Sequence, residues 1–111
     1  RRIGRIQSIN LKNNHLVGTL PPAIFEIPYL ETLNVEDNAD LTVDFSSIDK
    51  AQFLKELDLS NTGVSNIDGI GGASNLEILH LTGNGIRGPL PSDLFGLTDL
   101  AYLYANDNSF S

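Results

Sequence analysis

Four acidic side chains near the middle of the chain are the residues best suited to chemistry: Glu36, Asp37, Glu56 and Asp58. Paired carboxylates can act as general acid and general base when burial shifts the pKa of one of them. No nucleophile accompanies these acids, and the glycine-rich segments 69–72 and 83–88 lack the lysine and the strand–turn–helix context of a phosphate-binding loop. We therefore expect the protein not to be an enzyme and assign no catalytic residue.

Metal binding is the second chemistry that these residue types could support. Asp37, Asp58 and Asn61 offer oxygen ligands for calcium, but they lack the closely spaced ligand loop of a dedicated site. His15 and His80 lie far apart in the chain, and the sequence contains no cysteine that could complete a zinc site. The sequence therefore predicts no metal and no cofactor.

Length and composition set the remaining limits. With 111 residues, 41% of them hydrophobic and 19% charged, the chain can form one domain with a buried core. Its net charge of −7 is repelled by phosphate backbones, which argues against a nucleic-acid partner. No apolar run approaches the roughly 20 residues that span a bilayer, so we expect no membrane insertion by this segment.

The strongest signal is an internal repeat of the pattern L-x-x-L-x-L-x-x-N-x-L, with other aliphatic residues at some leucine positions. The pattern begins at residues 6, 30, 54, 76 and 100, at spacings of 24, 24, 22 and 24 residues. It divides the chain, 1–111, into one array of repeats 6–29, 30–53, 54–75 and 76–99 with a partial repeat 100–111. We expect this array to be a fragment without capping repeats, so that more chain or a neighbouring subunit covers Leu100, Leu103 and Phe110.

The L-x-L segment of each repeat predicts a short strand whose aliphatic side chains point inward. One such strand cannot bury its apolar side alone, but stacked copies form a parallel sheet above a continuous core. We expect these strands near 8–11, 32–35, 56–59, 78–81 and 102–105. Second short strands are expected near 18–20 and 87–90, and loops or short 3₁₀ turns elsewhere.

A polar position follows each strand and predicts a structural ladder along the array. An asparagine amide there can bond backbone groups of its own and the neighbouring repeat, which would otherwise be buried without partners. Thr62 can make fewer such bonds, so we expect a weaker rung at that repeat. The predicted ladder consists of Asn14, Asn38, Thr62, Asn84 and Asn108.

Two repeats carry a further signature, Gly18-Thr19-Leu20-Pro21 and Gly88-Pro89-Leu90-Pro91. This Gly-x-Leu-Pro segment resembles the plant-type leucine-rich repeat of receptor-like kinase ectodomains and polygalacturonase-inhibitor-like proteins. The resemblance implies an α/β-type, β-rich solenoid: a right-handed horseshoe with short parallel strands on its concave face and loops or 3₁₀ turns on its convex face. Repeats two and three depart from the signature, and repeat three is two residues shorter.

The outward-pointing strand residues predict a concave binding face with two parts. The C-terminal part is aromatic, and the middle part holds the four acids named above. Tyrosine offers a large contact area with few rotatable bonds, so the aromatic part is the better interface candidate. Ordinary strand decoration or contact with a missing next repeat for the aromatic part, and a solvated surface for the acids, remain alternatives. The predicted partner-binding residues are Ile78, His80, Tyr102, Tyr104, Glu36, Asp37, Glu56 and Asp58.

These features favour a non-catalytic module that binds a protein or peptide partner through the concave face, as a receptor ectodomain or an inhibitor would. The alternative is a structural or assembly subunit of a larger multiprotein complex, which would contact its neighbours through its ends and convex side. The family resemblance favours an extracellular or membrane-anchored ectodomain, and a location in an organelle or a complex stays open. Fold alone does not choose between these functions.

Overall fold

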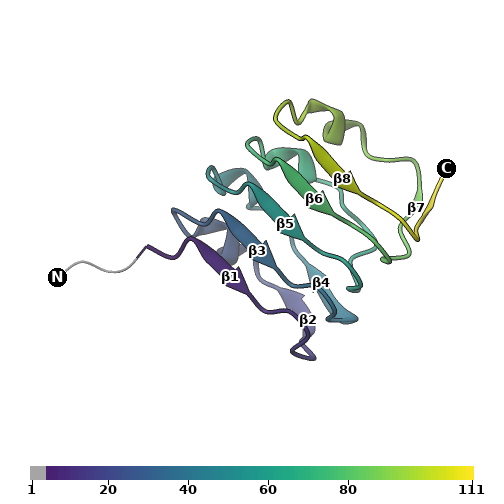
Figure 1. The fold of residues 1–111 in the computed structure, drawn as a ribbon, viewed down its shortest axis with the longest axis horizontal. Helices are drawn as coiled ribbons and strands as arrows, with labels where there is room; N and C mark the ends of the chain where they lie inside the picture. Colours follow the sequence, from purple (N-terminus) through teal and green to yellow (C-terminus); the bar gives the residue numbers. More distant parts are fainter. Residues whose placement is uncertain (1–4) are drawn as a thin grey trace.

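The computed structural model describes residues 5–111, and its principal sheet takes one parallel strand from each repeat (Figure 1). The strand order is β1-β3-β5-β6-β8, so neighbours in the sheet are neighbours in the array. All five strands lie where the repeat pattern predicts them, and each ends one residue earlier than expected. The strands are β1 (Ser8–Asn10), β3 (Thr32–Asn34), β5 (Glu56–Asp58), β6 (Ile78–His80) and β8 (Tyr102–Tyr104).

The central residue of each strand points into the core, and these residues pair in register from one repeat to the next. Leu33, Leu57 and Leu79 are at most 1% exposed, because each is covered by the repeats on both sides. Leu103, in the last strand, is 38% exposed. The stacking of repeats therefore buries the apolar side of every strand that has two neighbours, as the predicted β-rich solenoid requires.

Short 3₁₀ helices form the opposite side of the array and confirm the predicted 3₁₀ turns. Each contributes one buried apolar side chain to the core, and Phe25 from the first packs against Phe45 with ring centroids 6.1 Å apart. No helix in the described range is long and apolar enough to cross a membrane. The 3₁₀ helices are η1 (Pro22–Glu26), η2 (Ile48–Lys50), η3 (Ile70–Gly72) and η4 (Ser92–Gly96).

Two smaller parallel sheets lie beside the principal one. β2 (Val17–Leu20) pairs with β4 (Asp40–Val43), and β7 (Arg87–Gly88) pairs with β9 (Ser109–Phe110). The sequence predicted β2 and β7 but not their partners, because backbone pairing does not require the Gly-x-Leu-Pro signature in the second strand. The shorter third repeat supplies no such strand within the described range, so the side sheet is interrupted between β4 and β7.

The asparagine position ties successive repeats together most completely at Asn38, which is 1% exposed. Its amide oxygen accepts the backbone N–H groups of Asn14 at 3.1 Å and Leu16 at 2.9 Å in the preceding repeat. Its amide nitrogen donates to the carbonyl oxygens of Leu11 at 3.0 Å and Val35 at 2.8 Å. One side chain therefore satisfies backbone groups of two repeats.

The equivalent positions of the later repeats keep all or part of this hydrogen-bond geometry. Asn108 accepts the N–H groups of Asn84 and Ile86, each at 3.0 Å, and so repeats the geometry of Asn38. Asn84 in turn accepts the N–H of Thr62 at 2.8 Å. The Thr62 hydroxyl donates to the Leu59 carbonyl of its own repeat at 2.8 Å.

Candidate functional site

The outward residues of the five strands form two columns across the concave sheet. One residue before the buried centre of each strand, the column reads Ser8, Thr32, Glu56, Ile78 and Tyr102. One residue after it, the column reads Asn10, Asn34, Asp58, His80 and Tyr104. Both columns change from small and polar, through acidic, to aromatic, so the character of the face changes along the array.

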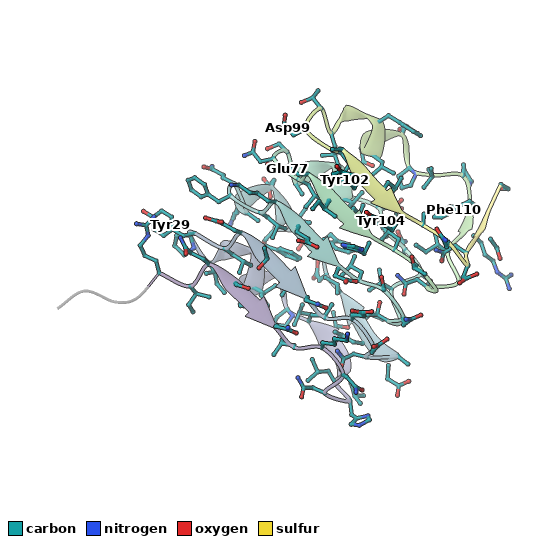
Figure 2. The ribbon with its side chains drawn as sticks, viewed as in Figure 1. Tyr29, Glu77, Asp99, Tyr102, Tyr104 and Phe110 are labelled. Atoms are coloured by element: carbon teal, nitrogen blue, oxygen red, sulfur yellow. The ribbon has the colours of Figure 1, made fainter. Side chains whose placement is uncertain are left out.

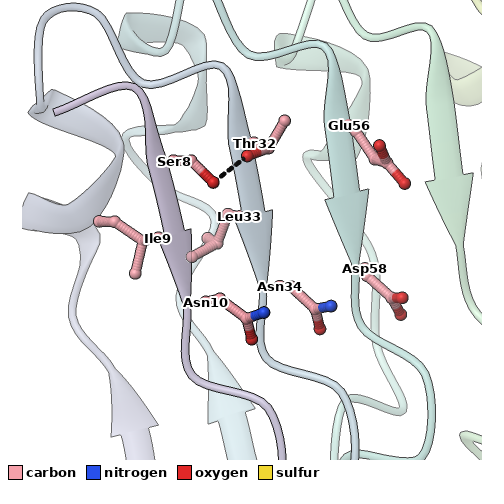
Figure 3. A pocket seen from close by; sticks show the side chains of 8 residues that line it. All are labelled: Ser8, Ile9, Asn10, Thr32, Leu33, Asn34, Glu56 and Asp58. Atoms are coloured by element: carbon pink, nitrogen blue, oxygen red, sulfur yellow. Dashed lines mark hydrogen bonds between the residues drawn. The ribbon is translucent and has the colours of Figure 1, made fainter.

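The polar part of this face is hollowed over β1, β3 and β5 (Figure 3). Thr32 donates its hydroxyl hydrogen to Ser8 Oγ at 2.6 Å across the first two strands. Of the residues that line this hollow, only Glu56 and Asp58 were predicted from the sequence as site residues. The smaller polar residues belong to the same two columns, so the strand alternation that selected the acids could also have selected them.

The second column has a fixed side-chain geometry in its first three members. Asn10, Asn34 and Asp58 each accept, at Oδ1, the backbone N–H of the residue two positions later, at 3.0, 2.9 and 3.0 Å. This Asx-turn geometry is open to an amide and to a carboxylate alike. The chain therefore shows the same turn with a neutral side chain twice and with a charged side chain once.

Three of the four predicted acids are engaged by side chains from an adjacent repeat. Glu56 and His80 were predicted as members of separate parts of the face, and their contact joins the acidic part to the aromatic part. The engaged pairs are Glu36 Oε1 with Lys12 Nζ at 3.6 Å, Asp37 Oδ1 with Asn61 Nδ2 at 3.1 Å, and Glu56 Oε2 with His80 Nε2 at 3.0 Å.

Asp37 also has a backbone role. Its φ of +63° lies in the left-handed region, and the equivalent positions of the other repeats share that conformation. Asparagine, aspartate and glycine tolerate this region better than other residues do. The residue type at this position therefore reflects the turn as well as any partner. The equivalent residues and their φ values are Asn13 at +54°, Asn61 at +54°, Gly83 at +73° and Asp107 at +57°.

The aromatic part consists of three nearly parallel rings. The His80 and Tyr104 rings stack with centroids 4.8 Å apart and planes 8° apart. Tyr102 and Tyr104 follow at 6.5 Å and 7°. Both tyrosines project from β8 and are 56% and 45% exposed (Figure 2). Ile78, which pairs in register with Tyr102, is half-buried beside them.

The geometry of this face suits recognition of another molecule. Its acids lie on an open sheet, and Asp37 is held by the Asn61 amide rather than grouped with Asp58 as a calcium site would require. Within residues 5–111, no group of three histidine, aspartate or glutamate side chains is placed to hold a metal ion. Exposed tyrosine rings, in contrast, are a residue type enriched at protein interfaces.

Comparison with known proteins identifies the class to which this fold belongs. Family models described as Leucine Rich Repeat and Leucine Rich repeats (2 copies) match residues 5–27 and 52–94. The chain belongs to the leucine-rich repeat family, whose fold generally serves protein interaction rather than catalysis. Within that family it is a plant-type repeat protein that resembles receptor ectodomains.

Two solved plant structures support the assignment to the plant-type repeats. The ectodomain of the Arabidopsis thaliana membrane receptor kinase GASSHO1/SCHENGEN3, in complex with CASPARIAN STRIP INTEGRITY FACTOR 2, is 27% identical with a TM-score of 0.85 over 96% of this chain. The BIR3–SERK2 complex from Arabidopsis thaliana is also 27% identical, with a TM-score of 0.85 over the whole chain. The present chain spans 13% and 61% of the lengths of these two proteins.

A bacterial protein shares the fold less closely. Internalin C2 from Listeria monocytogenes is 26% identical, with a TM-score of 0.63 over 94% of this chain and 53% of its own. The two plant structures match at the same level of identity but with higher structural similarity. The leucine-rich repeat fold is therefore shared by plant and bacterial proteins at this level of identity.

Proposed function

We propose that this chain is a non-catalytic recognition module that holds a protein or peptide partner against its concave face. The observation that carries the proposal is the pair Tyr102 and Tyr104, which are exposed and stacked on one strand of an open sheet. A tyrosine in a paired strand loses little conformational freedom on binding and offers a large amphipathic surface. Such residues supply most of the binding energy in many interfaces.

The relatives support the same class of partner. One of the two plant ectodomains is described in complex with CASPARIAN STRIP INTEGRITY FACTOR 2, and the other structure is itself a complex of two proteins, BIR3 and SERK2. Those partners belong to those proteins. What carries over to the present chain is the proposal that its sheet binds a protein or peptide surface.

Binding, rather than catalysis, is also the role that suits the acids. Glu36 and Glu56 are paired with Lys12 and His80; Glu56 lies on β5 and Glu36 lies two residues after the end of β3. These acids are better suited to steering a partner and fixing its orientation.

The test is selection of ligands from a phage-displayed random-peptide library on the immobilised chain, followed by affinity measurements on the selected peptides. The double variant Tyr102→Ala/Tyr104→Ala should weaken their binding about 30-fold, the effect of losing a major interface residue. Phe95→Ala is the matched control, because Phe95 is 73% exposed on η4, outside the concave sheet. Equal affinity of the double variant and the native chain would remove the aromatic part as the binding site.

A second candidate function, an assembly subunit, is favoured by two exposed apolar side chains outside the concave sheet. Val17 on β2 and Phe95 on η4 are 79% and 73% exposed. If assembly were the function, Phe95→Ala would reduce association with the neighbouring subunit, and the double tyrosine variant would not. The same two variants therefore separate the two functions.

A further inference from the structure

We infer that the partner of the concave face is an extended basic segment, with an arginine or lysine at Asp58 and an aromatic or large apolar side chain at Tyr104. This inference rests on the proposed function and adds the chemistry and spacing of the partner. Asp58 and Tyr104 belong to the same outward column, on β5 and β8, and only His80 on β6 lies between them.

Asp58 is the acid of the two outward columns that has no basic side chain as a partner in the described range. Its Oδ1 accepts the Ser60 N–H at 3.0 Å, which fixes the carboxylate at the edge of the hollow over β1, β3 and β5 (Figure 3). Within residues 5–111, no lysine, arginine or histidine pairs with Asp58, whereas Glu36 and Glu56 each have such a partner. A held carboxylate with a free oxygen suits a charge-assisted hydrogen bond from a guanidinium or ammonium group.

The charge balance of the face favours the same partner. Within residues 5–111, Lys12 is the lysine that pairs with one of the four acids, and its partner is Glu36. The whole chain carries a net charge of −7. An acidic segment would be repelled by this surface, whereas a basic one would be attracted over a range set by the ionic strength.

The spacing of the two anchors sets the spacing of the ligand. Neighbouring strands lie about 4.8 Å apart, so two steps from β5 to β8 cover about 10 Å. An extended peptide in the polyproline II conformation advances about 3.1 Å per residue with three residues per turn, so side chains three positions apart lie on the same side, about 9 Å from each other, and match this span. The basic residue and the aromatic residue should stand three positions apart, with the chain crossing His80, whose ring already stacks on Tyr104.

Defined peptides test the inference directly. We would measure binding of an otherwise neutral extended peptide with the pattern Arg-x-x-Trp, of its Glu-x-x-Trp analogue, and of a peptide in which Arg and Trp are adjacent. The Arg-x-x-Trp peptide should bind about tenfold tighter than the Glu analogue at low ionic strength, and the difference should shrink as salt is added. The adjacent arrangement should lose most of this advantage, because it cannot reach both anchors.

Asp58→Asn isolates the charge, because Asn10 and Asn34 make the same turn with an amide oxygen. This variant should bind the Arg-x-x-Trp peptide about fivefold more weakly and lose most of the preference over the Glu analogue. Asp68→Asn is the matched control: Asp68 is exposed outside the concave sheet, so the same loss of charge should leave the preference unchanged.

Several results would overturn the inference while leaving the proposed function intact. They are equal binding of the Arg and Glu peptides, equal effects of Asp58→Asn and Asp68→Asn, and selection from the random library of concave-face ligands without an excess of arginine and lysine. In each of these cases Tyr102→Ala/Tyr104→Ala would still weaken binding. If that double variant also binds its selected ligands normally, the proposed function fails as well. No measurable binding of the Arg-x-x-Trp peptide would also overturn the inference.

Discussion

Gly63 donates its N–H to the Leu41 carbonyl oxygen at 2.8 Å, and a Cβ built on Gly63 would lie 2.9 Å from that same oxygen. The bond joins the second and third repeats beside Thr62, whose hydroxyl bonds to Leu59 of its own repeat and to Asn84 of the fourth repeat. A backbone contact thus connects two repeats at the point where the side-chain ladder changes from asparagine to threonine. The contact depends on the absence of a side chain at residue 63.

Gly63→Ala should therefore lower the free energy of unfolding by about 1–3 kcal/mol, because the added methyl group forces the two backbones apart. Gly96→Ala is the control, since a Cβ at Gly96 has open space around it. Urea unfolding of both variants measures the difference. A Gly63→Ala variant as stable as Gly96→Ala would show that the two repeats can separate at no cost.

Asn38→Ala should be among the most destabilising single substitutions of a polar residue. It removes the bonds to Asn14, Leu16, Leu11 and Val35 and leaves buried backbone groups without partners, at a cost of about 3 kcal/mol. The exposed Asn14 contributes its backbone N–H to this network, so Asn14→Ala should change stability by less than about 0.5 kcal/mol. Comparable losses in thermal unfolding for the two variants would contradict this assignment of the rung.

The left-handed backbone at Asp37 predicts a dependence on residue shape. Asp37→Val should lower the free energy of unfolding by about 1–2 kcal/mol, because a branched side chain is strained at a φ of +63°. Asp37→Asn should be nearly neutral, since asparagine tolerates this region and its Oδ1 can still accept from Asn61 Nδ2. Chemical denaturation of the pair separates the backbone role of Asp37 from its charge, and equal stability would argue against the strain.

Asp44 predicts a pH dependence of stability. The Ser46 backbone N–H, donated to Asp44 Oδ1 at 2.9 Å, lowers the pKa of this carboxyl below its ordinary value, and the Ser46 side chain adds to that effect. A folded-state pKa below the unfolded one stabilises the fold above the unfolded pKa. This stabilisation should disappear as the pH falls through the folded pKa.

Nuclear magnetic resonance titration of the Asp44 side chain checks this shift, with the carboxyl expected to titrate below 3.8. Ser46→Ala should raise the pKa only part of the way back, because the backbone N–H, the larger cause, remains. Asp44→Asn should flatten the acid end of the stability profile. A titration of Asp44 at or above the ordinary pKa of an aspartate in the native chain would contradict the predicted direction.

The leucine spacing was enough to predict the principal sheet, because an inward residue such as Leu57 is required in every repeat and its position defines the strand. The spacing could not predict β4, since Asp40–Val43 forms a strand only because β2 offers a backbone to pair with. The local sequence does not show whether a neighbouring strand is available for backbone pairing. The side sheet therefore had to be seen in three dimensions.

Only part of the candidate site could be predicted from the sequence, because contacts between strands depend on the folded sheet. Alternation along each strand placed Glu56 and His80 on the same face, but it did not show that they touch. Glu56 is in register with Ile78, and its contact with His80 at 3.0 Å runs diagonally across two strands. The rotamers that make this contact depend on the sheet and not on the repeat pattern. The free carboxylate of Asp58 likewise became evident only once the partners of the other acids were known.

The interruption of the side sheet has a mechanical consequence. β2 with β4 and β7 with β9 each join two repeats by strand pairing on a second line of hydrogen bonds, whereas the third repeat is joined to β4 there by the Gly63–Leu41 bond and pairs no strand with β7. Bending and torsion of the array should therefore concentrate between the third and fourth repeats, which carry Asp58 and His80. A ligand that binds to both the third and the fourth repeat would make the segment between them more rigid. Binding on the concave face would then change the curvature of the whole array.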